Sequence, residues 1–107
     1  MTCERGIRTF ANGAYDRATL DLAAVREVRR LTPFHVVVDP SHAAGYADLV
    51  PELAAAALSF GAQGLLVDVV LPQADRSKIL CDGEQGVFPD VLRKMVARAF
   101  DRAERLA

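Results

Sequence analysis

The sequence predicts a single α/β domain with a parallel sheet, because strand and helix patterns alternate along the chain. Residues 34–39, FHVVVD, and residues 64–70, GLLVDVV, are short apolar runs rich in β-branched residues. Such runs are typical of parallel strands that are covered on both faces. Helical spacing of apolar residues follows each run, which indicates right-handed strand–helix–strand crossovers. With 107 residues, the chain is long enough for one domain over residues 1–107.

The first strand–helix unit begins at the start of the sequence. Residues 1–5 form the expected strand, and a loop rich in Arg, Gly, Asn and Thr follows it. Apolar residues then recur at helical spacing, with Thr19 as the expected N-cap and Pro33 as the stop. These apolar residues are Leu20, Leu22, Val25, Val28 and Leu31.

The second and third units repeat this order. The strand at 34–39 is followed by a loop, PSHAAGYA, and by a helix that Asp48 is expected to cap and Gly61 to end. The strand at 64–70 is followed by the loop LPQADRSKILCDGEQG and by a last helix. The apolar stripe of that helix consists of Phe88, Leu92, Met95, Val96, Ala99, Phe100, Ala103 and Leu106.

Composition argues against several classes of protein. The formal net charge of -1 and the pI of about 6.1 do not fit a general binder of nucleic acids or membrane surfaces. No apolar run approaches the roughly 20 residues that span a bilayer, and no signal-peptide pattern is present, so we expect a cytoplasmic protein. Cys3 and Cys81 are too few for a disulfide scaffold, and we expect Cys3 in the core.

Polar and charged residues gather where the predicted strands end. They are Glu4 and Arg5 at the end of the first strand, residues 39–42 after the second, Asp68 in the third, and residues 81–83 in the last loop. Ligands of open parallel sheets bind outside the carboxyl ends of the strands. We therefore expect a functional site at this edge of the sheet.

One imidazole and two carboxylates at this edge, His42, Asp68 and Asp82, have the donor chemistry of a divalent metal site for Mn, Fe, Co or Zn. Cys81 is a candidate further ligand or reactive thiol. Structural alternatives remain open. His42 could cap the second helix or face solvent, Asp82 could form a turn with Gly83, and Asp68 could be a paired carboxylate.

Asp68 is the most informative of these residues, because an unpaired acid at a dry sheet end is costly. It needs a cation, and Arg5, Arg8 or a metal could each serve. Arg5 and Arg8 flank Gly6 and offer planar donor forks for phosphate or carboxylate, while the small Gly6 lets the backbone approach a ligand. The alternative is a surface pair of arginines that neutralises nearby acids.

Five segments, in this order, resemble one known family. They are CERGIRTF, TLDLAAV, VVVDPSHAAG, DLVPELAAAAL and GAQGLLVDV, followed by a DG loop and a closing helix. They resemble the C-terminal part of the DAHP (3-deoxy-D-arabino-heptulosonate 7-phosphate) synthases of the type I beta group. The resemblance implies three βα units of a partial (β/α)8 barrel. It also implies an enzyme that uses a divalent metal to condense phosphoenolpyruvate with erythrose 4-phosphate, in the shikimate pathway of aromatic amino acid biosynthesis.

The resemblance assigns roles to individual residues. It implies that His42, Asp68 and Asp82 bind the metal and that Arg5 binds the phosphoenolpyruvate. The expected catalytic residues are then Arg5, Asp39, His42 and Asp68. The expected binding residues for a small anionic substrate are Arg5, Arg8 and Ser41.

Several residues depart from the family's pattern. Asp68 stands where the family has Glu, and Val70 replaces a neighbouring His. Tyr46 and Ala47 replace an arginine pair, and Cys81 replaces a Ser. The front five βα units, which supply the family's metal cysteine and most of its phosphate contacts, have no counterpart in this sequence. We therefore expect a different substrate, as in secondary metabolism, and Cys81 as a candidate substitute for the missing cysteine.

Three βα units leave two unpaired sheet edges and an inner face without an opposite wall, and exposed apolar edges favour association. We expect a homo-oligomer, a dimer or higher, or a complement to a longer synthase. The expected function is metal-assisted aldol-type chemistry on an enolpyruvate-like anion by a repurposed enzyme. The alternative is a non-catalytic regulatory or scaffolding subunit that binds a longer synthase or pathway enzyme. An inactive remnant is a third reading.

Overall fold

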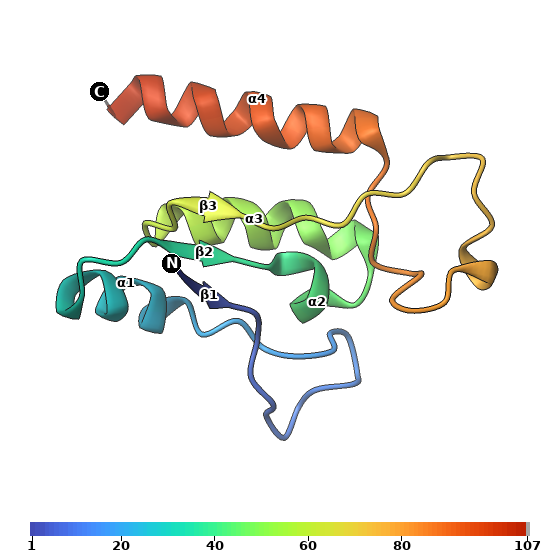
Figure 1. The fold of residues 1–107 in the computed structure, drawn as a ribbon, viewed down its shortest axis with the longest axis horizontal. Helices are drawn as coiled ribbons and strands as arrows, with labels where there is room; N and C mark the ends of the chain where they lie inside the picture. Colours follow the sequence, from blue (N-terminus) through green and yellow to red (C-terminus); the bar gives the residue numbers. More distant parts are fainter. Residues whose placement is uncertain (107) are drawn as a thin grey trace.

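A computed structural model describes residues 1–106 except the side chain of Leu106, and it contains one three-stranded parallel sheet (Figure 1). The strands are β1 (Thr2–Glu4), β2 (Val36–Val38) and β3 (Gly64–Leu65), in the order β1-β2-β3. β2 pairs in parallel with β1 along its whole length and with β3 over two residues. The predicted α/β fold with parallel strands is confirmed.

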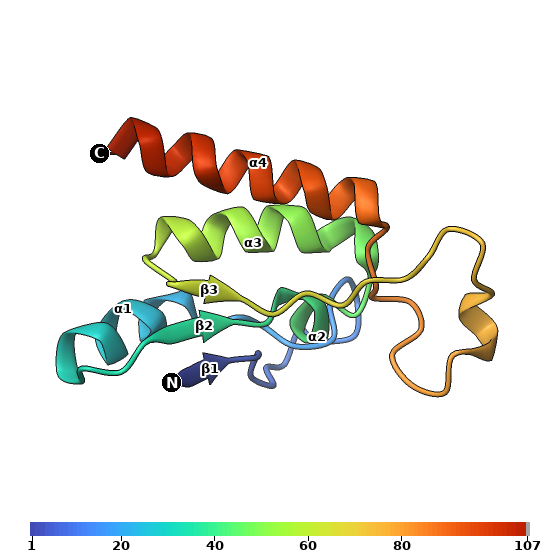
Figure 2. The same ribbon diagram turned by 45° about the horizontal axis from the view of Figure 1, so that its top comes forward.

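Three long helices follow the strands in turn. They are α1 (Leu22–Leu31), α3 (Val50–Ser59) and α4 (Pro89–Leu106). A short helix, α2 (Pro40–Ala44), and two 3₁₀ turns, η1 (Ala47–Leu49) and η2 (Arg76–Lys78), lie in the connections. Figure 2 shows α4 beside α3, at the opposite end of the molecule from β1. Among residues 1–106, no helix has the length and apolar character needed to cross a bilayer.

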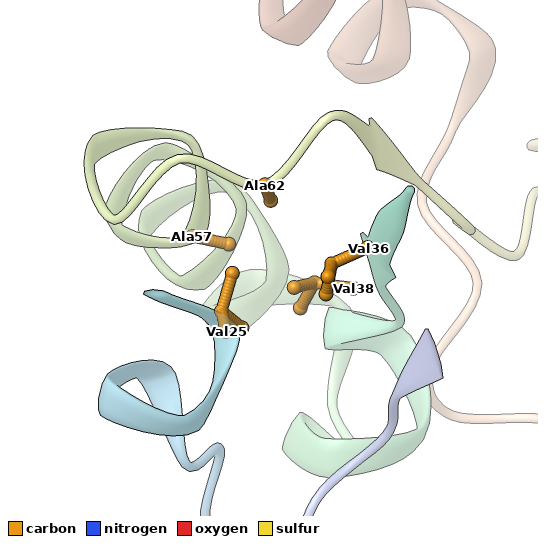
Figure 3. Close-up of a cluster of buried hydrophobic side chains, with 5 residues drawn as sticks. All are labelled: Val25, Val36, Val38, Ala57 and Ala62. Carbon is orange, nitrogen blue, oxygen red and sulfur yellow. The ribbon is translucent and has the colours of Figure 1, made fainter. Parts of the chain in front are cut away.

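The main core lies between β2 and the helices α1 and α3 (Figure 3). Val36 and Val38 of β2 are 2% and 0% exposed, and they pack with Val25 of α1 and Ala57 of α3. Side chains alternate along a strand, so Val37 lies on the opposite face of the sheet. Burial of these side chains is the main force that holds the helices on the sheet.

A second core cluster joins α3 to α4. Ala54 of α3 and Met95 of α4 are buried there together with Val50 and Val87. The predicted apolar stripe of α4 is therefore only partly covered, since Val96 and Phe100 are 45% and 68% exposed. The side chain of Leu106, which was expected at the end of this stripe, is outside the described part of the structure.

Both predicted N-caps are wrong. Asp21, not Thr19, caps α1, because its Oδ1 accepts a hydrogen bond from the Ala24 N–H at 3.0 Å. Thr19 instead forms an isolated antiparallel bridge with Ile7 across the first loop. Asp48 lies within η1, which runs directly into α3, and Leu49 occupies the N-cap position without a side-chain hydrogen bond.

The predicted loop after the second strand contains helix α2, and the predicted third strand is too long. β3 ends at Leu65 because the chain then turns to other partners. The Asp68 N–H donates to Ser41 Oγ at 2.9 Å, and Val69 forms a single parallel bridge with Val87. Cys3 was expected in the core, but it is exposed on the edge strand β1.

The two faces of the sheet differ in their cover. Val38 and its β3 partner Leu65 point to the face on which α1, α3 and α4 are stacked. On the other face, no helix of residues 1–106 packs against Val37, and Leu66 is 49% exposed. β1 and β3 form the two edges of the sheet, and neither has a further strand beside it within residues 1–106.

Candidate functional site

The site is built around α2 at the carboxyl end of β2, on the side toward which the strand arrows point in Figure 1. Asp39 follows β2 directly and caps α2, since its Oδ1 accepts a hydrogen bond from the His42 N–H at 3.0 Å. Pro40 occupies the first turn, and Gly45 ends the helix in the left-handed conformation at φ 76°. This single turn carries His42 into the site.

His42 is held between two carboxylates. Its Nδ1 lies 2.8 Å from Asp39 Oδ2, and its Nε2 lies 3.2 Å from Asp82 Oδ2. The Nδ1 contact is a hydrogen bond, whereas the Nε2 contact is a distance between oppositely polar groups that also suits two neighbouring ligands of one ion. The ring therefore neither caps the second helix nor projects into solvent.

The loop that carries Asp82 is fixed by Arg76. Arg76 donates to the carbonyl oxygens of Gly83 and Gly86 at 3.0 and 2.7 Å, and its guanidinium lies 5.2 Å from the centre of the Phe88 ring. A Cβ at Gly83 would lie 2.4 Å from the Arg76 carbonyl oxygen, so only glycine fits there. Asp82 itself has a positive φ of 55°, which turns its carboxylate toward His42.

Asp68 is paired through a buried amide, not with Arg5 or Arg8 as expected. Gln85 is fully buried, and its Nε2 donates to Asp68 Oδ2 at 2.6 Å. The Gln85 Oε1 accepts a hydrogen bond from Arg17 at 2.6 Å. The same Arg17 nitrogen donates to Asp82 Oδ1 at 2.9 Å. Arg17 and Gln85 therefore link the carboxylates of Asp68 and Asp82.

The three residues predicted to bind substrate, Arg5, Arg8 and Ser41, lie in three different environments. Arg5 lies beside the site with its Nε 3.5 Å from Asp39 Oδ2, and 61% of its side chain is exposed. Arg8 is exposed and forms no ion pair within residues 1–106. Ser41 is fully buried, and its hydroxyl accepts the Asp68 N–H, so it ties α2 to the segment after β3.

Gly6 is required for packing in the first loop. Its φ is +107°, and an added Cβ would lie 2.7 Å from the Ala18 Cβ and 3.2 Å from the Ala43 Cβ. The glycine thus lets the first loop pack against α2, and the approach of a ligand to its backbone stays a prediction. Nearby, burial raises the pKa of the Cys3 thiol and the charge of Asp39 raises it further, which favours the protonated thiol at neutral pH.

The residues fit a divalent cation in part. The 3.2 Å between His42 Nε2 and Asp82 Oδ2 suits two neighbouring ligands that each lie about 2.1 Å from one ion. The bond from Asp39 to Nδ1 is the usual outer contact of a metal-binding imidazole. Asp68, Cys81 and Asp82 line one pocket of about 370 Å³. Within residues 1–106, however, no three His, Cys, Asp or Glu side chains are grouped to hold an ion.

Sequence reasoning missed Arg17, Gln85 and Arg76. Arg17 lies in an irregular loop whose residues have no periodicity, and it meets Asp82 from 65 positions away. Gln85 gave one usable signal, since it stands between the Asp82-Gly83 turn and the apolar Val87, where a buried polar side chain needs partners. Nothing local in the sequence marks Arg76.

Comparison with known proteins gives the family. Residues 1–104 match the DAHP synthetase I family. The phospho-2-dehydro-3-deoxyheptonate aldolase of Thermotoga maritima is 38% identical over 106 residues, which make up 99% of this chain and 30% of the aldolase. A truncated form of 3-deoxy-D-arabino-heptulosonate 7-phosphate synthase from the same organism superposes with a TM-score of 0.85 at 38% identity. That match covers 97% of this chain and 38% of the synthase chain.

A crystal structure of the phospho-2-dehydro-3-deoxyheptonate aldolase (DAHP synthase) of Thermotoga maritima also superposes with a TM-score of 0.85, over 97% of this chain and 29% of that chain. This chain thus spans about a third of the length of these relatives and corresponds to their C-terminal part. The three βα units are accordingly part of a larger barrel fold. The predicted resemblance is confirmed, and the chain belongs to the DAHP synthetase I family.

Proposed function

We propose that this chain provides one side of a DAHP-synthase-like active site that joins an enolpyruvate-like anion to a carbonyl compound. The observation that carries the proposal is the polar network at the strand ends, in which His42 lies between Asp39 and Asp82 with Arg5 beside them. The names of the relatives, an aldolase and a synthase, support this class of reaction. Because the chain spans about a third of their length, the activity of this chain is a proposal that rests on these contacts.

Each residue has a role that its contacts support. Arg5 is exposed at the rim and offers its guanidinium to a carboxylate or phosphate of the substrate. Asp39 is buried, and its two contacts to His42 fix the orientation of the imidazole. Nε2 of His42 and the Asp82 carboxylate then face each other, ready to hold a proton or a cation between them.

A divalent ion bound here, Mn, Fe, Co or Zn, would act as a Lewis acid on the carbonyl oxygen of the substrate. His42 and Asp82 are its proposed ligands, with Asp68 or Cys81 from the adjoining pocket as candidate further ones. Since Tyr46 and Ala47 stand where the family has arginines, we propose a substrate with less phosphate than erythrose 4-phosphate, in a repurposed biosynthetic pathway.

Binding of phosphoenolpyruvate, measured by isothermal titration calorimetry with and without Mn²⁺, tests this function. We expect binding to the wild-type protein that is strengthened by Mn²⁺. His42→Ala should abolish the Mn²⁺ dependence, and Arg5→Gln should weaken binding about tenfold, as the loss of a charged hydrogen bond does. The matched control is Arg93→Gln, which removes an exposed arginine from α4. Equal binding by all four proteins, or binding by none, would contradict the proposal.

A second candidate function is that of a non-catalytic partner of a longer synthase. The two open edges of the sheet and the lack of a three-donor group within residues 1–106 favour it. It predicts a stable complex with a full-length synthase of the family, detected by sedimentation, that persists in His42→Ala. A metal-dependent ligand site without such a complex would favour the enzyme instead.

A further inference from the structure

Arg17 supplies a positive charge inside the polar network. Its guanidinium donates to Asp82 Oδ1 at 2.9 Å and to Gln85 Oε1 at 2.6 Å, from the same nitrogen. The Nε2 of Gln85 in turn donates a hydrogen bond to Asp68 Oδ2 at 2.6 Å. The two carboxylates proposed for cation binding are thus already occupied by donors from the chain itself.

The fold holds Arg17 in this position. Its backbone N–H lies 3.1 and 3.2 Å from the carbonyl oxygens of Ala43 and Ala44 in α2. Its side chain runs over Gly45, where an added Cβ would lie 3.1 Å from the Arg17 Cβ and 3.4 Å from its Nε. The absence of a side chain at Gly45 therefore leaves the path along which the guanidinium reaches Asp82.

The acceptor oxygens of Asp82, Gln85 and Asp68 already have donors from the chain. In the described part of the chain, every buried side-chain nitrogen and oxygen has a hydrogen-bond partner. A carboxylate that accepts a guanidinium has lost part of its attraction for a second cation, because the two positive charges repel at short range. Forty-five per cent of the Arg17 side chain is exposed, so solvent is available to the guanidinium if it leaves Asp82.

We propose that Arg17 is an internal counter-cation that, together with Gln85, occupies Asp82 and Asp68 and thereby limits divalent-cation binding at His42 and Asp82. This inference rests on the proposed function, because it concerns the same pair of candidate ligands. It adds a control of cation binding by Arg17, which His42 and Asp82 alone do not provide. A cation binds there fully only when Arg17 withdraws, and an anionic substrate that attracts the guanidinium would favour that withdrawal.

The test is calorimetric titration of the apo-protein with Mn²⁺ alone, without substrate. Arg17→Gln should bind Mn²⁺ about tenfold more tightly than the wild type, the effect expected from removing one nearby like charge. Arg17→Lys keeps the charge but shortens the side chain, which weakens its contacts with Asp82 and Gln85, so we expect a smaller gain of about threefold. That variant also serves as the test if Arg17→Gln does not give the wild-type circular dichroism spectrum.

Two controls locate the effect. Arg93→Gln removes a positive charge of the same kind far along the chain and should leave the Mn²⁺ affinity unchanged. Arg17→Gln combined with His42→Ala should lose the gain, because the cation then lacks a ligand. Unchanged or weaker Mn²⁺ binding in both Arg17 variants would overturn the inference, the weaker result meaning that Arg17 orients Asp82 as a ligand.

The Mn²⁺ titrations of the Arg17 variants and the phosphoenolpyruvate titrations test the counter-cation role and the proposed function separately. Tighter Mn²⁺ binding in Arg17→Gln with no binding of phosphoenolpyruvate would support the counter-cation role and contradict the function. Phosphoenolpyruvate binding that depends on Arg5 and His42, with no gain in the Arg17 variants, would do the reverse.

Discussion

The two faces of the sheet are made from adjacent residues of one strand, yet the helices of residues 1–106 cover only one of them. Val36 and Val38 are enclosed by α1 and α3, whereas Val37 between them faces the side that no helix of residues 1–106 covers. The covered face depends on helices that pack next to their own strands. The site at the ends of the strands depends instead on single side chains that meet across 65 and 68 positions, as Arg17 meets Asp82 and Gln85.

The largest expected effect is the loss of stability when a valine is shortened on the covered face of the sheet, compared with the open face. Val38→Ala removes two methyl groups from a side chain that is 0% exposed, and should lower the free energy of unfolding by about 3 kcal/mol. Val37→Ala is its matched control on the open face and should cost about 1 kcal/mol or less. Urea denaturation followed by circular dichroism measures both. Equal losses would mean that the open face is as tightly packed as the covered one.

The next effect tests whether the first loop is held by packing against α2. Gly6 and Gly13 both have positive φ, +107° and +101°, but only Gly6 is crowded, while an added Cβ at Gly13 meets nothing within 4 Å. Gly13→Ala should therefore cost about 1 kcal/mol, the backbone strain alone. Gly6→Ala should cost about 2 to 3 kcal/mol, since the clash is added. Similar melting temperatures for the two variants would argue against that packing.

A smaller effect is expected on self-association of the chain through the open face. Leu66 is 49% exposed on this face, and we propose that copies of the chain associate through it. Leu66→Lys should weaken self-association about tenfold, or 1.4 kcal/mol, because a lysine resists burial. Sedimentation velocity at several concentrations measures it, with Leu31→Lys, an exposed leucine at the end of α1, as control. A wild-type protein that stays monomeric at micromolar concentration would refute this association.

The smallest effect lies in the long loop before α4. The Ser77 hydroxyl and, less strongly, the Ser77 N–H lower the pKa of Asp75. Because the pKa is lower in the folded state, this stabilisation is present above the unfolded pKa of Asp75 and is lost as the pH falls through the folded value. Ser77→Ala should move the Asp75 pKa back toward its ordinary value in an NMR titration. An unchanged pKa would show that the hydroxyl contact is absent in solution.

Local pattern predicted the sheet and the long helices, because spacing alone carries that information. The β-branched run at 36–38 and the 3.6-residue spacing in α1 and α4 are both visible in the sequence. Helix α2 was missed because it has only five residues, and its stability comes from the Asp39 cap and not from periodicity. The third strand was overextended because, beyond Leu66, the backbone of residues 68–70 pairs with Ser41 and Val87, which the local sequence does not reveal.

For the site, the sequence predicted the edge of the sheet at which the polar residues gather, but not which side chains pair there. His42 and Asp82 were expected together, and their side chains touch, because parallel strands end at one edge. The protein partner of Asp68 was expected to be Arg5 or Arg8, yet it is Gln85, backed by Arg17, while a metal beside Asp68 stays a prediction. Such pairings depend on how two irregular loops fold over each other, and loops carry no repeating signal.

The order β1-β2-β3 with all strands parallel makes the two borders of the sheet unlike each other, and this limits the symmetry of any assembly. Joining β3 of one copy to β1 of the next continues the parallel arrangement and adds strands in threes, which never total the eight of a full barrel. Joining like borders across a twofold axis makes that seam antiparallel. The symmetry of an assembly would therefore reveal which border had been used.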